Sequence, residues 1–263
     1  MKRRPSITDK LIPLAALLIL ILVWELICLL GIVPGYMLPS PVRVGAAFIS
    51  EFPLMMSHAW VTLCETAAGL FLGIILGFIT AAVMDTFGTV KRALYPILVL
   101  SQTIPTVALA PLLILWFSYG MAPKVILIVL TSFFPIAVGL MDGFAGIDPD
   151  QINLMRAMKA GKLQIFIHLK FPGALPEFFS GLKIAVSYSV VSAVVSEWLG
   201  GTSGLGVYMI RVKKSYSYDK MFAVIILVSA VSLMLIALLN IISRKAMPWK
   251  HCGSYNGGEG ESK

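Results

Sequence analysis

Charged residues are scarce in this chain. They make up 13% of its 263 residues, whereas hydrophobic residues make up 58%. A soluble domain carries about a quarter charged residues, so this composition argues against a soluble protein and indicates an integral membrane protein. Cysteine is scarce as well. Cys28, Cys64 and Cys252 are odd in number and far apart, so the sequence predicts neither a disulfide framework nor a metal site.

The usual motifs of catalysis are also missing. There is no G-x-x-x-x-G-K-[ST] phosphate loop, because Gly161-Lys162 has no glycine at the required upstream position and is followed by Leu163. Neither an H-E-x-x-H pair nor a G-x-S-x-G elbow occurs. We therefore expect no catalytic residue and no cofactor bound by this chain. If the protein transports a solute actively, the energy has to come from an ion gradient or from a partner.

Long apolar runs fill most of the sequence. Crossing about 30 Å of hydrocarbon takes about 20 helical residues, and the candidate spans are 11–30, 61–84, 94–117, 125–141, 182–199 and 222–242. These six runs predict an all-α polytopic membrane protein with a single transmembrane domain over residues 1–263. We expect the first run to be a retained helix, because it is long for a signal peptide and no small-x-small cleavage site follows it. The tail 243–263 is expected to be disordered.

Lys and Arg are unevenly distributed between the predicted loops. Most of the 21 basic residues fall at the two termini and in the loops on the same side. Because cytoplasmic loops are enriched in Lys and Arg, both termini are predicted to be cytoplasmic. The cluster Arg211–Lys220 lies on the opposite side and departs from this rule. Membrane topology thus accounts for much of the net charge of +8, and we expect no nucleic-acid partner.

Small and polar residues recur inside several spans. Gly69, Gly73, Gly77 and Ala81 are spaced every four residues, which is typical of close helix packing. A second stripe is compatible with packing or with lining a solute path, and it contains Gly181, Ala185, Ser189, Ser192 and Ser196.

The span 94–117 is interrupted by the polar segment Ser101–Thr106. Polar groups at membrane depth are tolerated against protein or a watery cavity, so this helix either packs with a kink or lines a pathway.

Ionisable residues in spans are functional candidates; of Glu25, Glu65 and Glu197 we assign a working role to Glu197 alone. The predicted translocation pathway consists of Gln102, Thr103, Thr106, Ser189, Ser192, Ser196 and Glu197.

A polar stretch within the loop 142–180 predicts a short amphipathic helix. Asp148 can cap it, Pro149 suits its first position, and Pro172 and Pro176 follow its end. A helix near 151–167 would present its apolar side to a groove on another protein and its basic side to an acidic surface. The alternative is an interfacial helix lying on lipid. The apolar residues are Ile152, Met155, Leu163 and Phe166, and the basic ones are Arg156, Lys159 and Lys162.

Several segments together resemble the permease subunits of bacterial ABC importers, in the branch that serves nitrate, sulfonates, taurine and thiamine-precursor pyrimidines. The resemblance extends from about Trp24 to about Lys220, with the pieces in the order and spacing of the family. The pieces are Trp24-Glu25-Leu26, Leu38–Pro41, Ser101–Pro111, Phe133-Phe134-Pro135, Pro172–Pro176, Glu197–Gly200 and Ser203–Gly206.

The loop 142–180 departs from the hallmark of that family. The hallmark is Glu-Ala-Ala, three residues and then Gly, in a cytoplasmic coupling helix that docks in a groove of the ATPase subunit. Aligned without gaps through Pro172, the corresponding residues are Asn153, Leu154, Met155 and Lys159. Despite this departure, the resemblance implies that the loop contacts the ATPase. The residues of the loop expected to make this contact are Asn153, Met155, Arg156, Lys159, Lys162, Leu163 and Phe166.

The resemblance implies a type I ABC importer permease fold in the bacterial cytoplasmic membrane. It implies three partners: an ATPase subunit that holds ATP and Mg, an extracytoplasmic solute-binding protein, and a second permease copy. The solute would be a thiamine-precursor pyrimidine or a similar small molecule, and a nitrate, sulfonate or taurine type is also compatible.

Two other classes of protein remain as alternatives. One is an ion-coupled secondary transporter in which Glu25, Glu65 or Glu197 carries the ion. Against it, we find neither buried charges in several spans nor an inverted repeat. The other is an intramembrane enzyme, which the missing catalytic motifs disfavour.

Overall fold

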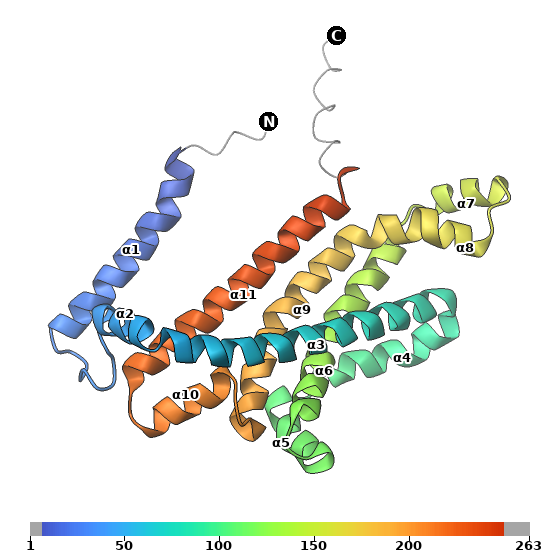
Figure 1. Ribbon diagram of the computed structural model, residues 1–263. Coiled ribbons are helices and arrows are strands. Elements are labelled where there is room, and N and C mark those ends of the chain that lie inside the picture. Colours follow the sequence, from blue (N-terminus) through green and yellow to red (C-terminus); the bar gives the residue numbers. More distant parts are fainter. Residues whose placement is uncertain (1–6, 250–263) are drawn as a thin grey trace, which may run out of the picture.

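The computed structural model describes residues 7–249, and within them every regular element is a helix. The predicted all-α fold class is therefore confirmed, and Figure 1 shows how the helices are arranged. In chain order they are α1 (Ile7–Leu29), α2 (Pro41–Ser50), α3 (Phe52–Thr86), α4 (Gly88–Ser101), α5 (Thr106–Phe117), α6 (Met121–Ala145), α7 (Pro149–Ala157), α8 (Lys162–Ile165), the π-helix η1 (Phe166–Lys170), α9 (Phe171–Gly200), α10 (Leu205–Lys214) and α11 (Tyr218–Ala246).

Four helical segments are long and apolar enough to cross a membrane: α3, α6, the continuous segment α8–η1–α9, and α11. The pair α4 and α5 makes a fifth if it counts as one broken span, bent by 98°. The apolar part of α1 is the shorter stretch Ala15–Leu29. Length and composition thus give four or five spans within residues 7–249, and with the shorter apolar helix α1 this is compatible with the six predicted.

The break between α4 and α5 has a local cause. Pro105 disfavours helical backbone at the residue before it and supplies no amide hydrogen to a helix. The chain leaves the helix at Gln102 and re-enters it at Thr106. The predicted span 94–117 is for this reason two short helices.

The ends of the helices gather on two sides of the molecule. In Figure 1 the start of α1, the end of α11 and the pair α7 and α8 lie toward the top, whereas α5 and α10 lie toward the bottom. Two ion pairs hold helix ends together. Lys170 Nζ lies 2.8 Å from Asp85 Oδ2 on the side of α8, and Lys220 Nζ pairs with Glu51 Oε1 near α10. Of the predicted tail, residues 243–246 belong to α11, and 250–263 lie outside the described residues.

Helices α3, α6 and α9 form the centre of the fold, and small residues allow their close approach. A Cβ on Gly69 of α3 would lie 2.5 Å from Ile128 Cβ of α6, and one on Gly73 would overlap Ser132 Oγ. On α9, a Cβ at Gly181 would overlap the carbonyl oxygen of Pro135 in α6. The stripe from Gly69 to Gly77 is therefore a packing surface.

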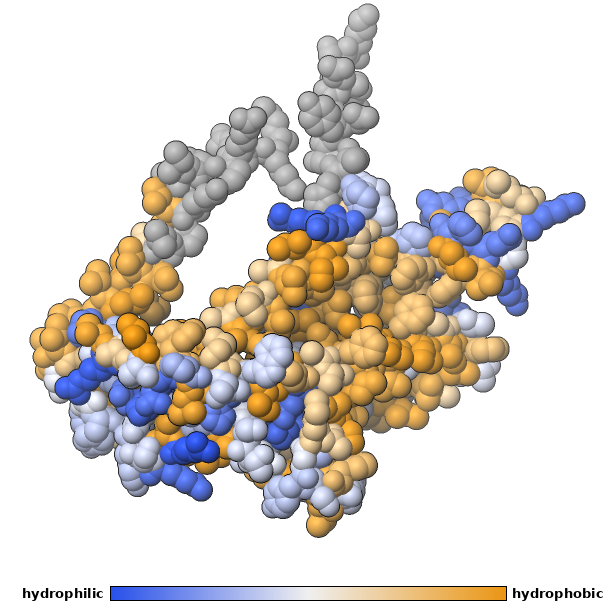
Figure 2. Space-filling model, in the orientation of Figure 1, coloured by the Kyte–Doolittle hydropathy of each residue, from blue (hydrophilic) through white to orange (hydrophobic). Residues whose placement is uncertain are grey.

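The surface matches a membrane location. Figure 2 shows hydrophobic residues over the middle of this face, with hydrophilic residues gathered at the lower left and at α7 and α8. Along α1 and α11 many large apolar side chains are exposed, among them Leu22, Leu29, Leu233 and Ile241. Exposed apolar surface of this extent is stable against lipid but not against water.

Candidate translocation cavity and coupling element

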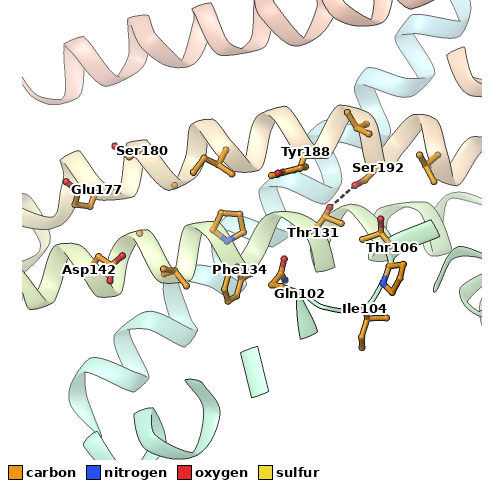
Figure 3. A pocket seen from close by; sticks show the side chains of 18 residues that line it. Gln102, Ile104, Thr106, Thr131, Phe134, Asp142, Glu177, Ser180, Tyr188 and Ser192 are labelled. Atoms are coloured by element: carbon orange, nitrogen blue, oxygen red, sulfur yellow. Dashed lines mark hydrogen bonds between the residues drawn. The ribbon is translucent and has the colours of Figure 1, made fainter. Parts of the chain in front are cut away.

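A cavity of about 710 Å³ lies between α6, α9 and the break that separates α4 from α5. Figure 3 shows side chains from all three segments pointing toward it. This volume is within the range of small-molecule sites, about 300–1,000 Å³. Its lining residues are Gln102, Ile104, Pro105, Thr106, Thr131, Phe134, Pro135, Val138, Gly139, Asp142, Glu177, Ser180, Gly181, Ile184, Tyr188, Val191, Ser192 and Val195.

One end of the cavity carries hydroxyl and amide groups. The break after α4 brings Gln102 and Thr106 to the cavity, where they lie near Thr131 of α6. Ser192 of α9 donates a hydrogen bond to Thr131 Oγ1 at 3.0 Å. Thr103, predicted to share this site, does not line the cavity, and its hydroxyl donates to Leu100 O at 2.8 Å.

The other end carries two carboxylates, Asp142 of α6 and Glu177 of α9, with Ser180 beside them (Figure 3). Both acids fall in the loop 142–180 of the sequence-based prediction, in which neither was given a role. The helices extend beyond the predicted spans, since α6 continues to Ala145 and α9 begins at Phe171. Helical periodicity carried five residues past each predicted boundary would have reached these positions.

Three other predicted pathway residues do not line this cavity. Ser189 and Ser196 are buried in α9, and their hydroxyls donate to the carbonyls of Val186 and Ala193, one turn back. Glu197 is 1% exposed. The serines of this stripe therefore lie in two environments. Ser192 lines the cavity, whereas Ser189 and Ser196 are buried in the packed interior.

Glu197 belongs to a buried polar cluster at the start of α10, which we call the α10 cap cluster and which consists of His58, Thr62 and Glu197. One carboxylate oxygen of Glu197 accepts a hydrogen bond from Thr62 Oγ1 at 2.7 Å, and the other accepts from the backbone N–H of Gly206 at 2.6 Å. Both oxygens are engaged. These contacts let Glu197 stabilise the start of α10, and its role in the pathway stays a prediction.

The α10 cap cluster satisfies the free amides at the helix start. Gly204 N–H donates to His58 Nδ1 at 3.0 Å, and Leu205 N–H donates to Thr62 Oγ1 at 2.9 Å. These groups would otherwise lack partners in a buried setting. Gly204 has φ of +121°, and a Cβ there would overlap the carboxylate of Glu197. The glycines therefore serve Glu197 in two ways: Gly204 leaves room for its carboxylate, and Gly206 donates a backbone hydrogen bond to it.

The first turns of α10 are further tied to α3 and α11. Tyr208 OH donates to Glu51 Oε2 at 3.3 Å, and Lys220 donates to the other oxygen. Burial, followed by the nearby charge of Glu51, raises the pKa of Tyr208 to about 12. The hydrogen bond from Lys220 holds the pKa of Glu51 below its usual range, more than offsetting its desolvation.

A second buried acid also has a structural partner. Glu65 of α3 pairs with Lys124 of α6, and both residues are at most 5% exposed. The other carboxylate oxygen, Glu65 Oε2, is buried with no hydrogen-bond partner among the described residues. Glu25 Oε2 is buried with no hydrogen-bond partner among the described residues.

The predicted amphipathic helix is broken into separate pieces. Asp148 Oδ1 caps α7 by accepting from Asp150 N at 2.9 Å, and α7 ends at Ala157. The chain turns at Lys159, whose φ of +59° lies in the left-handed region that favours glycine. This is the position at which the resemblance expects glycine. The next helix, α8, starts at Lys162 and continues through η1 into α9.

The break changes which apolar side chains of this coupling element (α7 and α8) are accessible. Phe166, predicted as a docking contact, instead packs against Phe144 and Phe78, with ring centroids 5.5 and 6.5 Å away. Met155 and Ile152 are half-buried. The large apolar side chains that are exposed are Leu154 at 63%, Met158 at 71% and Leu163 at 71%. The polar candidates Asn153, Arg156, Lys159 and Lys162 are all exposed.

Comparison with known proteins agrees with this architecture. Residues 69–247 match the family described as "Binding-protein-dependent transport system inner membrane component". The chain is 38% identical over 223 residues to a "Probable ABC transporter permease protein" of Haemophilus influenzae, covering 85% of this chain and 91% of that one. It is 37% identical over 239 residues to the "Formylaminopyrimidine transport permease protein ThiX" of Halalkalibacterium halodurans, covering 90% and 95%.

A solved structure shares the fold. An inward-facing structure of the MetNI methionine ABC transporter aligns with a TM-score of 0.67 at 19% identity, over 75% of this chain and 98% of that chain.

Proposed function

Because this chain belongs to the family of binding-protein-dependent transport system inner membrane components, we propose how it works as an ABC importer permease. A pair of these chains passes a small solute that an extracytoplasmic binding protein delivers, and ATP hydrolysis in a separate subunit drives the step. The observation that carries this proposal is the position of the exposed coupling element, directly between the two helices that line the cavity.

The connectivity suggests how force reaches the cavity. The coupling element is joined to α6 through residues 146–148 and to α9 through η1. Helices α6 and α9 pack at Gly139 and Gly181, where no side chain separates the backbones. The Lys170–Asp85 ion pair ties the same end to α3. A displacement of the coupling element by the ATPase would move α6, α9 and α3 together, as in other rigid-body switches.

The exposed surface of the coupling element suits a groove on a partner. Leu154, Met158 and Leu163 project from it next to Arg156 and Lys162. Apolar anchors at helical spacing with flanking charges are typical of helix-in-groove recognition. The coupling element would then be cytoplasmic, with both termini on the same side. A Ser262→Cys reporter, placed outside the described residues, should react only with reagents that enter the cytoplasm; labelling in intact cells by an impermeant reagent would contradict this orientation.

Family membership weighs against the alternative of an ion-coupled secondary transporter. Glu65 is paired with Lys124, and both oxygens of Glu197 accept hydrogen bonds. Both oxygens of Glu197 and one oxygen of Glu65 are thus already engaged within the protein. The solute is proposed to be a small organic molecule, and the relatives that share this architecture include one named for formylaminopyrimidine and one named for aliphatic sulfonates.

Affinity purification tests the proposed assembly. We expect the tagged chain to bring down an ATPase subunit in a complex with two copies of each, since cyclic two-fold symmetry is the common solution for such pairs. The double variant Leu154→Asp/Met158→Asp should lose the ATPase, and Gln151→Ala, an exposed position of α7 outside the predicted contact set, serves as a control that leaves the apolar anchors in place. Recovery of a folded, transport-competent chain without an ATPase would overturn the proposal.

A further inference from the structure

A second cavity, of about 580 Å³, lies beside α10. In Figure 1 this helix is on the side of the molecule opposite α7 and α8. The cavity, which we call the α10 cavity, is large enough for a small-molecule site. Its lining residues come from the end of α9, from α10 and from the start of α11, and they are Trp198, Met209, Ile210, Lys213, Lys214, Tyr216, Tyr218 and Met221.

The polar part of the α10 cavity consists of two lysine side chains. Lys213 and Lys214 are exposed, and among residues 7–249 neither takes part in an ion pair or a side-chain hydrogen bond. The nearby Glu51 is already paired with Lys220. Asp219, in the first turn of α11, can offset only one of the two charges. The cavity therefore keeps a net positive charge.

These lysines lie where membrane topology does not favour them. Lys and Arg are enriched in cytoplasmic loops, and the cluster Arg211–Lys220 is the departure from that rule on the predicted extracytoplasmic side. Topology thus gives no reason for the cluster, whereas an anionic ligand at this end of the molecule does.

The rest of the lining is aromatic and apolar. Trp198, Tyr216 and Tyr218 lie at or next to the ends of α9 and α11, and Trp and Tyr are the residues that concentrate where a membrane meets water. Met221 and Ile225 are one turn apart on the same face of α11, and Ile225 is 40% exposed. The apolar lining therefore continues along α11 toward the middle of the membrane.

An occupant of the α10 cavity has to combine a negative charge with an apolar chain. A soluble anion would leave the apolar lining uncovered. The acidic surface of a docked protein would meet the lysines but would not enter the lining that continues into the membrane. A phospholipid with an anionic headgroup supplies both parts, because its phosphate can accept charge-assisted hydrogen bonds from lysine and its acyl chains cover apolar surface.

We propose that the α10 cavity is a binding site for an anionic phospholipid. Lys213 and Lys214 hold the phosphate, and an acyl chain lies along Met221 and Ile225. The inference goes beyond the proposed function, since it needs only that the chain spans a membrane. The bound lipid would anchor α10 to the surface of the bilayer, at the end of the molecule remote from the coupling element.

The test counts the lipids that stay bound to the purified protein in detergent, by native mass spectrometry. Anionic phosphatidylglycerol and zwitterionic phosphatidylcholine with the same acyl chains are supplied in equal amounts. We expect the anionic lipid to be retained at least about tenfold more than the zwitterionic one, and Lys213→Gln/Lys214→Gln to abolish this preference. The control Lys91→Gln/Arg92→Gln removes two exposed cations of α4, outside the cavity, and should leave the preference within about twofold of wild type.

A competition experiment separates a lipid from a soluble anion. Glycerol 3-phosphate carries the phosphate without acyl chains, and we expect it not to displace phosphatidylglycerol. Displacement by equal amounts of glycerol 3-phosphate would overturn the role of the apolar lining.

Two further outcomes would overturn the lipid site itself. One is equal retention of the two lipids by the wild-type protein, a comparison that needs no variant. The other is a Lys213→Gln/Lys214→Gln variant that keeps its preference for phosphatidylglycerol; if that variant also loses uptake that depends on a binding protein, the lysines serve protein docking instead. Neither outcome depends on recovery of an ATPase, which tests the proposed function separately.

Discussion

The cavity and the α10 cap cluster use similar residues for opposite purposes. Both contain an acid and a threonine on helices that cross the membrane. In the α10 cap cluster both oxygens of Glu197 accept hydrogen bonds, and the residue is 1% exposed. At the cavity Glu177 is exposed and has no ion-pair partner among the described residues. A polar group inside a span is therefore informative about transport only once its hydrogen-bond partners are known.

Substituting each of the two acids separately should give the largest difference between these roles. Glu197→Ala should lower the free energy of unfolding by about 3 kcal/mol, because it leaves the Gly206 amide and the Thr62 hydroxyl without their buried acceptor. Glu177→Gln should change it by less than about 0.5 kcal/mol. The measurement is thermal unfolding in detergent, followed by a thiol-reactive dye. Equal losses in the two variants would contradict the distinction between a structural and a cavity acid.

The second largest loss of stability is expected where α6 and α9 pack closely at the cavity wall. Gly181→Ala places a methyl group against Pro135 O, and overpacking of this kind costs about 1–3 kcal/mol. Gly45→Ala in α2 is the matched control, since no atom lies within 4 Å of its added Cβ and alanine favours a helix. The same thermal assay should show a lower midpoint for the first variant only.

The serines of α9 sharpen the comparison within a single helix. Ser192→Val and Gln102→Leu replace polar groups at the cavity, and each should reduce uptake about tenfold, or about 1.4 kcal/mol in the barrier. Ser196→Val changes a serine that bonds its own helix and should leave uptake within about twofold of wild type. Uptake by proteoliposomes with a normal subunit ratio provides the measurement. Unchanged uptake in both cavity variants would make this face a packing surface.

The smallest effect is expected at the exposed end of the fold. Glu51→Gln removes the charge that pairs with Lys220, and a partly exposed pair contributes about 0–1 kcal/mol. Because the pKa of Glu51 is lowered in the folded protein, its contribution is present at neutral pH and is lost as the pH falls below about 4. Wild type and variant should converge in stability at that pH. A difference that grows on acidification would contradict the sign of the pKa shift.

The fold class was predicted correctly from the sequence, and the features that the sequence did not reveal have physical causes. Hydrophobic runs and the Ser101–Thr106 interruption indicated membrane helices and placed Gln102 and Thr106 at the cavity. The role of Glu197 was missed because its partners, Thr62 and Gly206, are distant in sequence. Asp142 and Glu177 were missed because hydropathy windows end at charged residues, even when the helix continues.

The coupling element is a second place where the sequence pattern did not predict which side chains are exposed. An amphipathic pattern over 151–167 predicted a single helix with Met155 and Phe166 on its outer side. The left-handed residue Lys159 divides that helix, so that α7 ends at Ala157 and α8 begins at Lys162. Phe166 then packs into the core, and Leu154 and Met158 become accessible. The glycine that the resemblance expects at position 159 was the signal for this turn, and hydrophobic periodicity alone did not use it.

Coupling is the claim on which the whole account depends, and one measurement tests it directly. ATP hydrolysis and solute uptake should be measured on the same proteoliposomes for wild type, Leu154→Asp and Lys159→Ala. An apolar anchor buried in a groove contributes about 1.5–3 kcal/mol, whereas an exposed charge contributes about 0–1 kcal/mol. We therefore predict that Leu154→Asp loses uptake, by uncoupled hydrolysis or by release of the ATPase, and that Lys159→Ala retains it. Normal coupling in Leu154→Asp would contradict docking through α7 and α8.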